Sequence, residues 1–307
     1  VQGFDTMIMR GDRVALVGPN VGLTRTPSLW PWLATAESGS DLAVLGAARA
    51  ADPDAVDVVV LGSSMAASNV STWMLERDSG RGVVNLGVNG TNAVQAAMWV
   101  DEVVRLGPDV GVWMSGPMSL DEQRLDVPNA FDWGIALAAW GPTAAVRSDV
   151  LSRAAIEASL VLRLRRVPRL AWDGRLAEST VHIRDRPTMP PRRFRRLAKA
   201  KAAEVEQAAV SADGPGGRAM RAAIDTFTEH DIRVVLVPAP VHPSVLQGRY
   251  FLPEHLHALT TIAHDTGARV LMPDAQPEWD AEDFRDPIHL GHSGQGELTR
   301  TLIEVVR

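Results

Sequence analysis

Five short runs of apolar residues stand out along the chain, and small or turn-forming residues follow each of them. The first run, residues 58–61, reads Val-Val-Val-Leu and leads into Gly62-Ser63-Ser64. Continuous β-branched runs of this length are typical of strands that are buried on both faces of a sheet. On this pattern we predict five core strands, at residues 58–61, 83–86, 110–114, 232–237 and 268–272.

Helical patterns alternate with these runs. Apolar residues recur with a helical period in four segments, and weaker signals predict a strand at 13–17 and a helix at 42–51. Strands that alternate with helices predict an α/β fold, here a three-layer α/β/α arrangement with a flavodoxin-like, mostly parallel sheet. Ligands of such sheets bind at the carboxyl ends of the strands. The four predicted helices cover residues 65–76, 93–106, 253–266 and 293–306.

Residues 120 to about 217 interrupt the alternation. They contain helical patterns at 140–170 and 192–210 and no convincing strand, so we predict one domain over 1–307 with a helical insertion at about 120–217. The insertion is strongly basic, which fits either a solvated helix face or a surface for an anionic polymer or anionic lipid headgroups. Its basic residues include Arg163, Arg165, Arg166, Arg169, Arg192, Arg193, Arg195, Arg196, Lys199 and Lys201.

Composition narrows the function classes. The 307 residues are 46% hydrophobic, which is ample for a large core, and the formal net charge of −6 argues against a nucleic-acid binder. The chain has no cysteine, so disulfides, thiolate catalysis and cysteine zinc sites are excluded. No uninterrupted apolar run approaches the ~18–20 residues of a membrane-spanning helix.

Metal binding is the rival use of the histidines in the C-terminal third. His255 and His257 are two residues apart and do not share a helix face, and no His-Glu-x-x-His or comparable ligand spacing occurs. We therefore expect neither a metal site nor a cofactor.

Ser64 is the first candidate for chemistry. It follows a predicted buried strand and precedes a predicted helix, so the turn would present its hydroxyl at the edge of the sheet where ligands bind. A serine hydroxyl needs a base to take its proton and a third group to orient that base. The alternative is structural, because serine is also a favoured helix N-cap and Ser63 or Ser64 would fill that position.

Asp286 and His289 supply the missing partners. At i and i+3 on a first helical turn, a carboxylate and an imidazole share one face. The carboxylate would then fix the histidine tautomer and stabilise the imidazolium ion. The alternative is that Asp286 caps a helix whose first residue is Pro287, in which case His289 has no special role.

The segment after the second predicted strand, Asn85 to Asn92, is the third candidate. A glycine of this segment would present its backbone N–H to an oxyanion, and the amide side chain of Asn89 or Asn92 would add a donor. The alternative is a plain turn between strand and helix, with Thr91 or Asn92 as the helix cap.

In their order along the chain, these three motifs resemble the SGNH (GDSL-type) hydrolase superfamily. Its nucleophilic serine follows the first core strand in a Gly-x-Ser turn, its oxyanion glycine follows the second strand, and an Asp-x-x-His pair lies near the C-terminus. The resemblance covers about residues 57–116 and 232–307. It implies that Ser64 is the nucleophile, His289 the general base and then acid, Asp286 the orienting carboxylate, and Gly90 an oxyanion donor.

Two positions depart from the family pattern. Ser63 stands where the family usually has Asp, a variant that also looks like the membrane-associated SGNH-like proteins of teichoic-acid D-alanylation and alginate O-acetylation. The family's Gly-x-Asn-Asp block after the third strand reads Gly116-Pro117-Met118-Ser119 here. Met118 cannot donate a hydrogen bond, and the loss of one oxyanion donor typically costs on the order of a hundredfold in rate. The departure favours a specialised enzyme or a different donor.

The resemblance implies a serine-dependent esterase or O-acyltransferase that works through an acyl-enzyme. Its expected substrates are O-acyl groups of carbohydrate or cell-surface polymer, with acetyl as the expected acyl group. The expected partner is that acylated substrate, with a membrane-associated protein as a further option and no nucleic acid. An extracytoplasmic or cell-envelope location is expected, and a cytoplasmic location stays open. The oligomeric state and the choice between hydrolysis and transfer are also open. The alternatives are a non-catalytic SGNH-like polysaccharide-binding or scaffold protein, and a nucleotide-binding domain, which would need a phosphate cradle that the sequence lacks.

Overall fold

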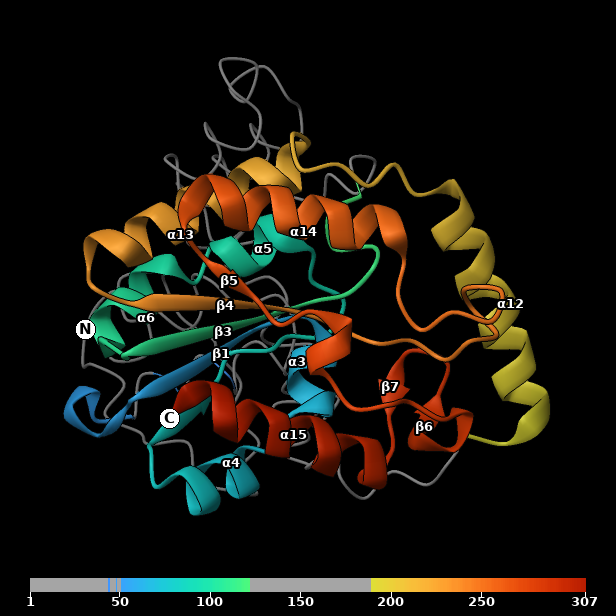
Figure 1. Ribbon diagram of the computed structural model, residues 1–307, viewed down its shortest axis with the longest axis horizontal. Coiled ribbons are helices and arrows are strands. Elements are labelled where there is room, and N and C mark those ends of the chain that lie inside the picture. Colours follow the sequence, from blue (N-terminus) through green and yellow to red (C-terminus); the bar gives the residue numbers. More distant parts are fainter. Residues whose placement is uncertain (1–43, 45–47, 49–50, 122–188) are drawn as a thin grey trace, which may run out of the picture.

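The computed structural model describes residues 44, 48, 51–121 and 189–307 (Figure 1). The strand predicted at 13–17 and the helix predicted at 140–170 lie outside these residues. Of the helix predicted at 42–51, Val44, Ala48 and Ala51 are described: Val44 and Ala48 are helical, and Ala51 lies in a bend.

A five-stranded sheet forms the centre of the fold, in the order β2-β1-β3-β4-β5. Every neighbouring pair is parallel, as the sequence predicts, and Gly62 at the end of β1 lies opposite Met114 of β3. The edge strand β5 is shorter than predicted because the chain leaves the sheet before Pro273 and enters a 3₁₀ turn. The strands are β1 (Val58–Gly62), β2 (Val83–Asn85), β3 (Val110–Ser115), β4 (Arg233–Pro238) and β5 (Arg269–Val270).

Helices cover both faces of the sheet, which confirms the three-layer α/β fold (Figure 1). Because side chains alternate along β1, Val59 and Leu61 join one core cluster and Val58 and Val60 the other. The first cluster is covered by α5 (Ala93–Ala97), α6 (Val100–Leu106), α13 (Pro215–Glu229) and α14 (Pro253–Thr266). The second is covered by α3 (Ser64–Asn69), α4 (Thr72–Ser79) and α15 (His292–Val306).

Two helices predicted as continuous are each divided into two. The segment predicted at 65–76 forms α3 and α4, because Val70 is extended and the Ser71 side chain accepts a 3.4 Å hydrogen bond from the Met74 amide and so caps a new helix. The segment predicted at 93–106 forms α5 and α6, divided at Met98 and Trp99. The first of these breaks ends α3 within two turns of Ser64.

Of the predicted insertion, the described part is residues 120–121 and 189–217. It contains α12 (Pro191–Gln207), which confirms the helix predicted at 192–210. Ala198 and Val205 are its buried residues, and its arginines and Lys199 are exposed. At the end of the insertion, Gly216 and Gly217 lie buried in the first turn of α13.

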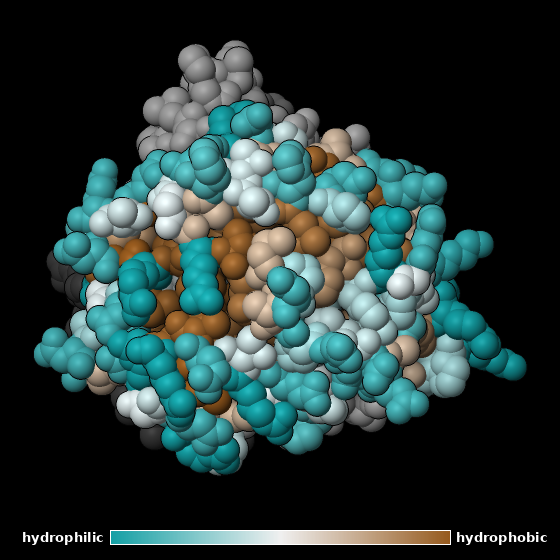
Figure 2. Space-filling view, in the orientation of Figure 1, coloured by the Kyte–Doolittle hydropathy of each residue, from teal (hydrophilic) through white to brown (hydrophobic). Residues whose placement is uncertain are grey.

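The remaining elements are short. A two-stranded antiparallel sheet, β6 (Phe284–Asp286) and β7 (His289–Leu290), precedes α15. In the described part of the chain, 3₁₀ helices cover Pro53–Ala55, Pro273–Ala275 and Ala281–Asp283. Hydrophobic residues are visible between α14 and α15, with hydrophilic side chains around them (Figure 2). None of the helices within the described ranges is long and apolar enough to span a bilayer.

Candidate active site

Ser64 is the first residue of α3, at the carboxyl end of β1, an inner strand of the sheet. The capping position belongs to Ser63, whose hydroxyl accepts a 3.3 Å hydrogen bond from the Met65 amide. The Ser64 hydroxyl is therefore not needed for capping. Gly62 allows the sharp exit from the strand: its φ is 135°, and a Cβ at this position would collide with the Met114 carbonyl oxygen.

Asp286 and His289 lie on a β-hairpin and not on the first turn of a helix, so the predicted local structure is wrong. Asp286 ends β6 and His289 begins β7, while the last helix starts only at His292. The turn is closed by the Asp286 carboxylate, whose Oδ1 accepts hydrogen bonds of 3.0 Å from both the Ile288 and the His289 amides. These hydrogen bonds stabilise a turn in place of a helix, and the turn still brings Asp286 and His289 together.

The three side chains form a continuous hydrogen-bonded relay. His289 Nδ1 lies 2.9 Å from Asp286 Oδ2 and 3.0 Å from Oδ1, and His289 Nε2 lies 2.8 Å from Ser64 Oγ. With Asp286 ionised, Nδ1–H donates to the carboxylate, which leaves Nε2 to accept the Ser64 hydroxyl proton. The predicted residues are thus within the reach that a nucleophile, its base and an orienting acid require.

The electrostatics of Asp286 favour its charged form. Its burial raises the pKa, but the hydrogen bond from His289, the charge of that imidazole, the Ile288 amide and the nearby Arg285 outweigh this effect and lower the pKa below its usual value. The side chains of Asp286 and His289 are only 14% and 15% exposed, so solvent screens their interaction weakly. A carboxylate in this state orients the imidazole and stabilises its protonated form.

Buried hydrogen bonds join the serine-bearing helix α3, and the Ser71 cap of α4 that follows it, to the hairpin and to α15. The Leu290 amide donates to Asn69 Oδ1 at 3.0 Å, and Gln295 Nε2 donates to the Ser68 carbonyl at 2.7 Å. A third bond of 3.0 Å runs from the Ser71 amide to Thr299 Oγ1. These contacts fix the position of α3 relative to β7 and α15, and therefore of Ser64 relative to His289.

Gly90 occupies an exposed turn beyond β2 with a φ of 77° and lines the same pocket as Ser64. Among the described residues, none accepts a hydrogen bond from the Gly90 amide. The Ser64 amide, as the first of a helix, has no partner within that helix. Two backbone donors of the pocket are therefore suited to a developing oxyanion.

The two asparagines of the predicted oxyanion site lie elsewhere. Asn92 is buried, and its Oδ1 caps α5 by accepting a 2.9 Å hydrogen bond from the Gln95 amide. This is the structural alternative weighed for the segment. Asn89 is exposed in the turn and is not among the residues that line the pocket. Of the three predicted oxyanion residues, only Gly90 faces the pocket.

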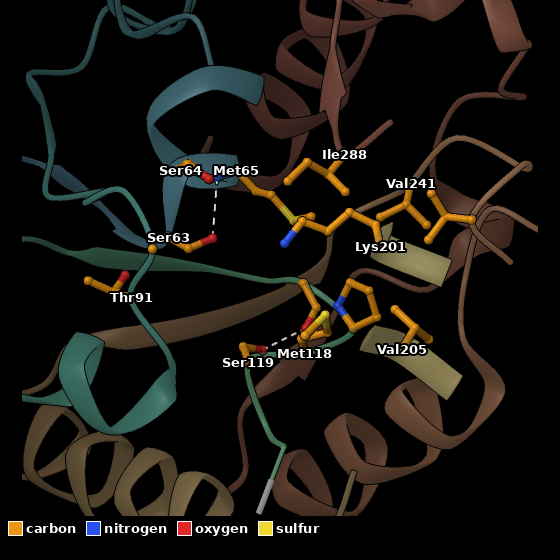
Figure 3. A pocket seen from close by; sticks show the side chains of 14 residues that line it. Ser63, Ser64, Met65, Thr91, Met118, Ser119, Lys201, Val205, Val241 and Ile288 are labelled. Carbon is orange, nitrogen blue, oxygen red and sulfur yellow. Dashed lines mark hydrogen bonds between the residues drawn. The ribbon is translucent and has the colours of Figure 1, made fainter. Parts of the chain in front are cut away.

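A pocket of about 160 Å³ opens beside Ser64 (Figure 3). Two of its walls were not foreseen from the sequence: α12 contributes Lys201 and Val205, and the segment after β4 contributes Val241 and Val245. Helical periodicity marks which residues of α12 share a face, but it does not indicate what that face covers. The other lining residues are Ser63, Met65, Gly90, Thr91, Gly116, Pro117, Met118, Ser119 and Ile288.

A second serine–histidine pair, Ser115 and His255, lies in the protein interior, and the direction of its hydrogen bonds differs from that of the Ser64–His289 pair. Ser115 Oγ lies 2.9 Å from His255 Nε2, and both residues are buried. The Ser119 hydroxyl donates to the Gly116 carbonyl at 2.7 Å, so it must accept the Ser115 proton, and His255 must donate to Ser115. In this direction His255 Nε2 carries a proton and is no base for Ser115. Burial lowers the pKa of His255 to about 3, which keeps the ring neutral.

Metal ligands are not grouped in the described part of the chain: no cluster of three or more histidine or acidic side chains there could hold an ion.

Comparison with known proteins yields structural similarity alone. No family model matches the chain, and no curated protein matches it. Among solved structures, TesA aligns with 82% of this chain and 98% of its own at 11% identity and a TM-score of 0.41. A GDSL-like lipase from Bacteroides thetaiotaomicron aligns with 88% of this chain and 100% of its own at 12% identity and a TM-score of 0.41. At these values function has to be argued from the site itself.

Proposed function

We propose that the protein is a serine esterase of the SGNH type that forms an acyl-enzyme on Ser64. The observation that carries this proposal is the relay from Asp286 through His289 to Ser64, with a 2.9 Å and a 2.8 Å hydrogen bond, at the edge of a pocket. A capping serine and an incidental histidine would have no reason to meet in this geometry across 225 residues of sequence.

The first half of the reaction acylates the serine. Ser64 Oγ attacks the ester carbonyl carbon while its proton passes to His289 Nε2, and Asp286 stabilises the resulting imidazolium. The Ser64 and Gly90 amides donate to the oxyanion of the tetrahedral intermediate. The bond from carbon to the alcohol oxygen then breaks, and that oxygen takes the proton from His289.

The second half releases the acyl group. His289, neutral again, removes a proton from water or from an acceptor hydroxyl, whose oxygen attacks the acyl carbon. The bond to Ser64 Oγ breaks and Oγ recovers a proton from His289. Attack by water makes the protein an esterase, and attack by a sugar hydroxyl makes it an O-acyltransferase. Acylated carbohydrate or cell-surface polymer is the substrate class that we propose, with acetyl as the first acyl group to test.

Covalent labelling tests the proposal. We expect a fluorophosphonate probe to label the wild-type protein at Ser64 and p-nitrophenyl acetate to be hydrolysed, with both signals lost in Ser64→Ala. Ser293→Ala, which removes an exposed serine from the first turn of α15, is the matched control and should keep both. A wild-type protein that is neither labelled nor active would contradict the proposal and favour the non-catalytic polysaccharide-binding alternative, in which polymer binding is unaffected by Ser64→Ala.

A further inference from the structure

Lys201 is the charged member of an otherwise neutral pocket lining. Of the described residues that form the wall around Ser64, it alone has a formally charged side chain, and its neighbours include Met65, Val205 and Ile288. Figure 3 shows the Lys201 side chain running from α12 into the pocket. The Lys201 side chain is only 21% exposed, so water screens its interaction with an anion less than it would at the open surface.

The contacts of Lys201 leave part of its hydrogen-bonding capacity for a ligand. Its Nζ donates a 2.7 Å hydrogen bond to Glu204 Oε2, one turn along the same helix. An ammonium group has three donors, and this contact uses one of them. Glu204 itself does not line the pocket. The ion pair therefore restrains the lysine while its remaining N–H groups are available toward the pocket.

We infer that Lys201 binds an anionic group, a carboxylate or a phosphate, carried by the substrate close to the ester that Ser64 attacks. The inference rests on the proposed esterase function and narrows its substrate class to anionic esters. A wall of Met and Val side chains would accept a neutral acyl chain without a lysine, whereas a buried anion needs a charged partner.

The outer face of α12 has the same sign of charge. Arg192, Arg193, Arg195, Arg196 and Lys199 are exposed on this helix, in a chain with a net charge of −6. Such a local excess of cations raises the rate at which anionic substrates meet the protein. Steering of this kind disappears at high salt, whereas a contact inside the pocket persists better.

Two pairs of matched esters test the inference, one for each side of the scissile bond. For the acyl side we would compare p-nitrophenyl hemisuccinate with p-nitrophenyl valerate, and for the alcohol side 4-acetoxybenzoate with its methyl ester. In at least one pair, Lys201→Met should lower the ratio of kcat/KM for the anionic over the neutral ester by about ten- to a hundredfold, the typical contribution of a charged hydrogen bond. Lys201→Arg should retain most of the ratio.

Lys199→Met is the control, because it removes the same charge from an exposed position two residues away. Its ratio should fall only slightly, and only at low salt. The neutral ester measured on the same protein shows that each variant is folded. If the wild-type protein hydrolyses the neutral esters but its ratios are unchanged in Lys201→Met, the Lys201 inference is wrong and the esterase proposal stands. If no ester is hydrolysed and Ser64 is not labelled, both fail together.

Discussion

The Leu290 amide donates a 3.0 Å hydrogen bond to Oδ1 of Asn69, which joins the residue after His289 to the last residue of the helix that Ser64 begins. Both partners are buried, and Asn69 is 0% exposed. The bond thus connects the segments that carry Ser64 and His289 through the protein interior, in parallel with their direct contact. Asn69 touches no reacting atom, and its role is to position the relay.

Replacement of Asn69 should show whether this residue positions Ser64 and His289 for catalysis or only stabilises the fold. In Asn69→Leu the Leu290 amide loses its acceptor, so we expect the free energy of unfolding to fall by about 1–3 kcal/mol. We also expect kcat for p-nitrophenyl acetate to fall by about tenfold or more with little change in KM, since misplacement of a base affects the chemical step. Steady-state kinetics and urea unfolding measure the two effects. A loss of stability with an unchanged kcat would show that Asn69 is only structural.

Asp286→Asn should impair catalysis far more than folding. An asparagine oxygen still accepts hydrogen bonds from the turn amides, but the neutral side chain neither stabilises the imidazolium nor enforces the correct tautomer. We expect kcat to fall on the order of 10³–10⁴-fold. Asp274→Asn, at an exposed 3₁₀-helical position, is the control and should have wild-type kinetics. Equal activity of the two variants would remove Asp286 from the mechanism.

Gly90→Ala tests whether the Gly90 amide belongs to the proposed oxyanion site, and Gly80→Ala is the control at a glycine with a similar positive φ. Gly90 and Gly80 have φ values of 77° and 72°, and in both places open space surrounds the missing Cβ. Each alanine should therefore cost about 1–2 kcal/mol of stability. Only Gly90→Ala should lower kcat, by about a hundredfold, because its amide would move away from the oxyanion. Equal kcat values for the two variants would argue against a catalytic role for Gly90.

Ser115→Ala distinguishes the buried serine–histidine pair from the proposed catalytic one. We expect fluorophosphonate labelling of Ser64 and ester hydrolysis to persist in this variant. Stability should fall by about 1–3 kcal/mol, because the buried His255 loses its partner. Loss of labelling in a variant that thermal unfolding shows to be folded would instead assign the nucleophile to Ser115.

His255 should make stability dependent on pH. Its pKa of about 3 in the folded protein lies below the value of about 6.5 for an exposed histidine. Between these values the unfolded chain binds a proton that the folded chain does not, so the free energy of unfolding falls with decreasing pH, by about 1.4 kcal/mol per pH unit.

Urea unfolding at pH 8, 6 and 5 measures this slope, which should be smaller in His255→Gln. The lowered pKa of Asp286 acts in the same direction, but only at more acidic pH, as its carboxylate is protonated. An identical slope in wild type and variant would contradict the assignment to His255.

The strands were predictable because each is a short, mostly apolar run that is followed by glycine, serine or proline. Ser64 was a candidate because it follows such a run, but Ser64 and the Asp286–His289 pair were each equally compatible with a helix cap. Their order along the chain, which resembles the SGNH pattern, is what brought the three residues together as one predicted site. The hairpin that holds Asp286 was not predictable, because Asp-Pro is equally compatible with a helix cap, and only the two amide contacts decide between them. The orientation of Lys201 depends on tertiary packing of α12, for which no local pattern exists.

The turn before Ser63 leaves no freedom at position 62. A side chain there would meet the Met114 carbonyl oxygen of the neighbouring strand as well as adopt an unfavourable φ, and neither problem can be relieved without opening the central pair of strands. We therefore expect no other residue type to be tolerated at position 62. A library randomised at this codon and selected for ester hydrolysis should return glycine alone, whereas one randomised at Gly90 should return weakened survivors.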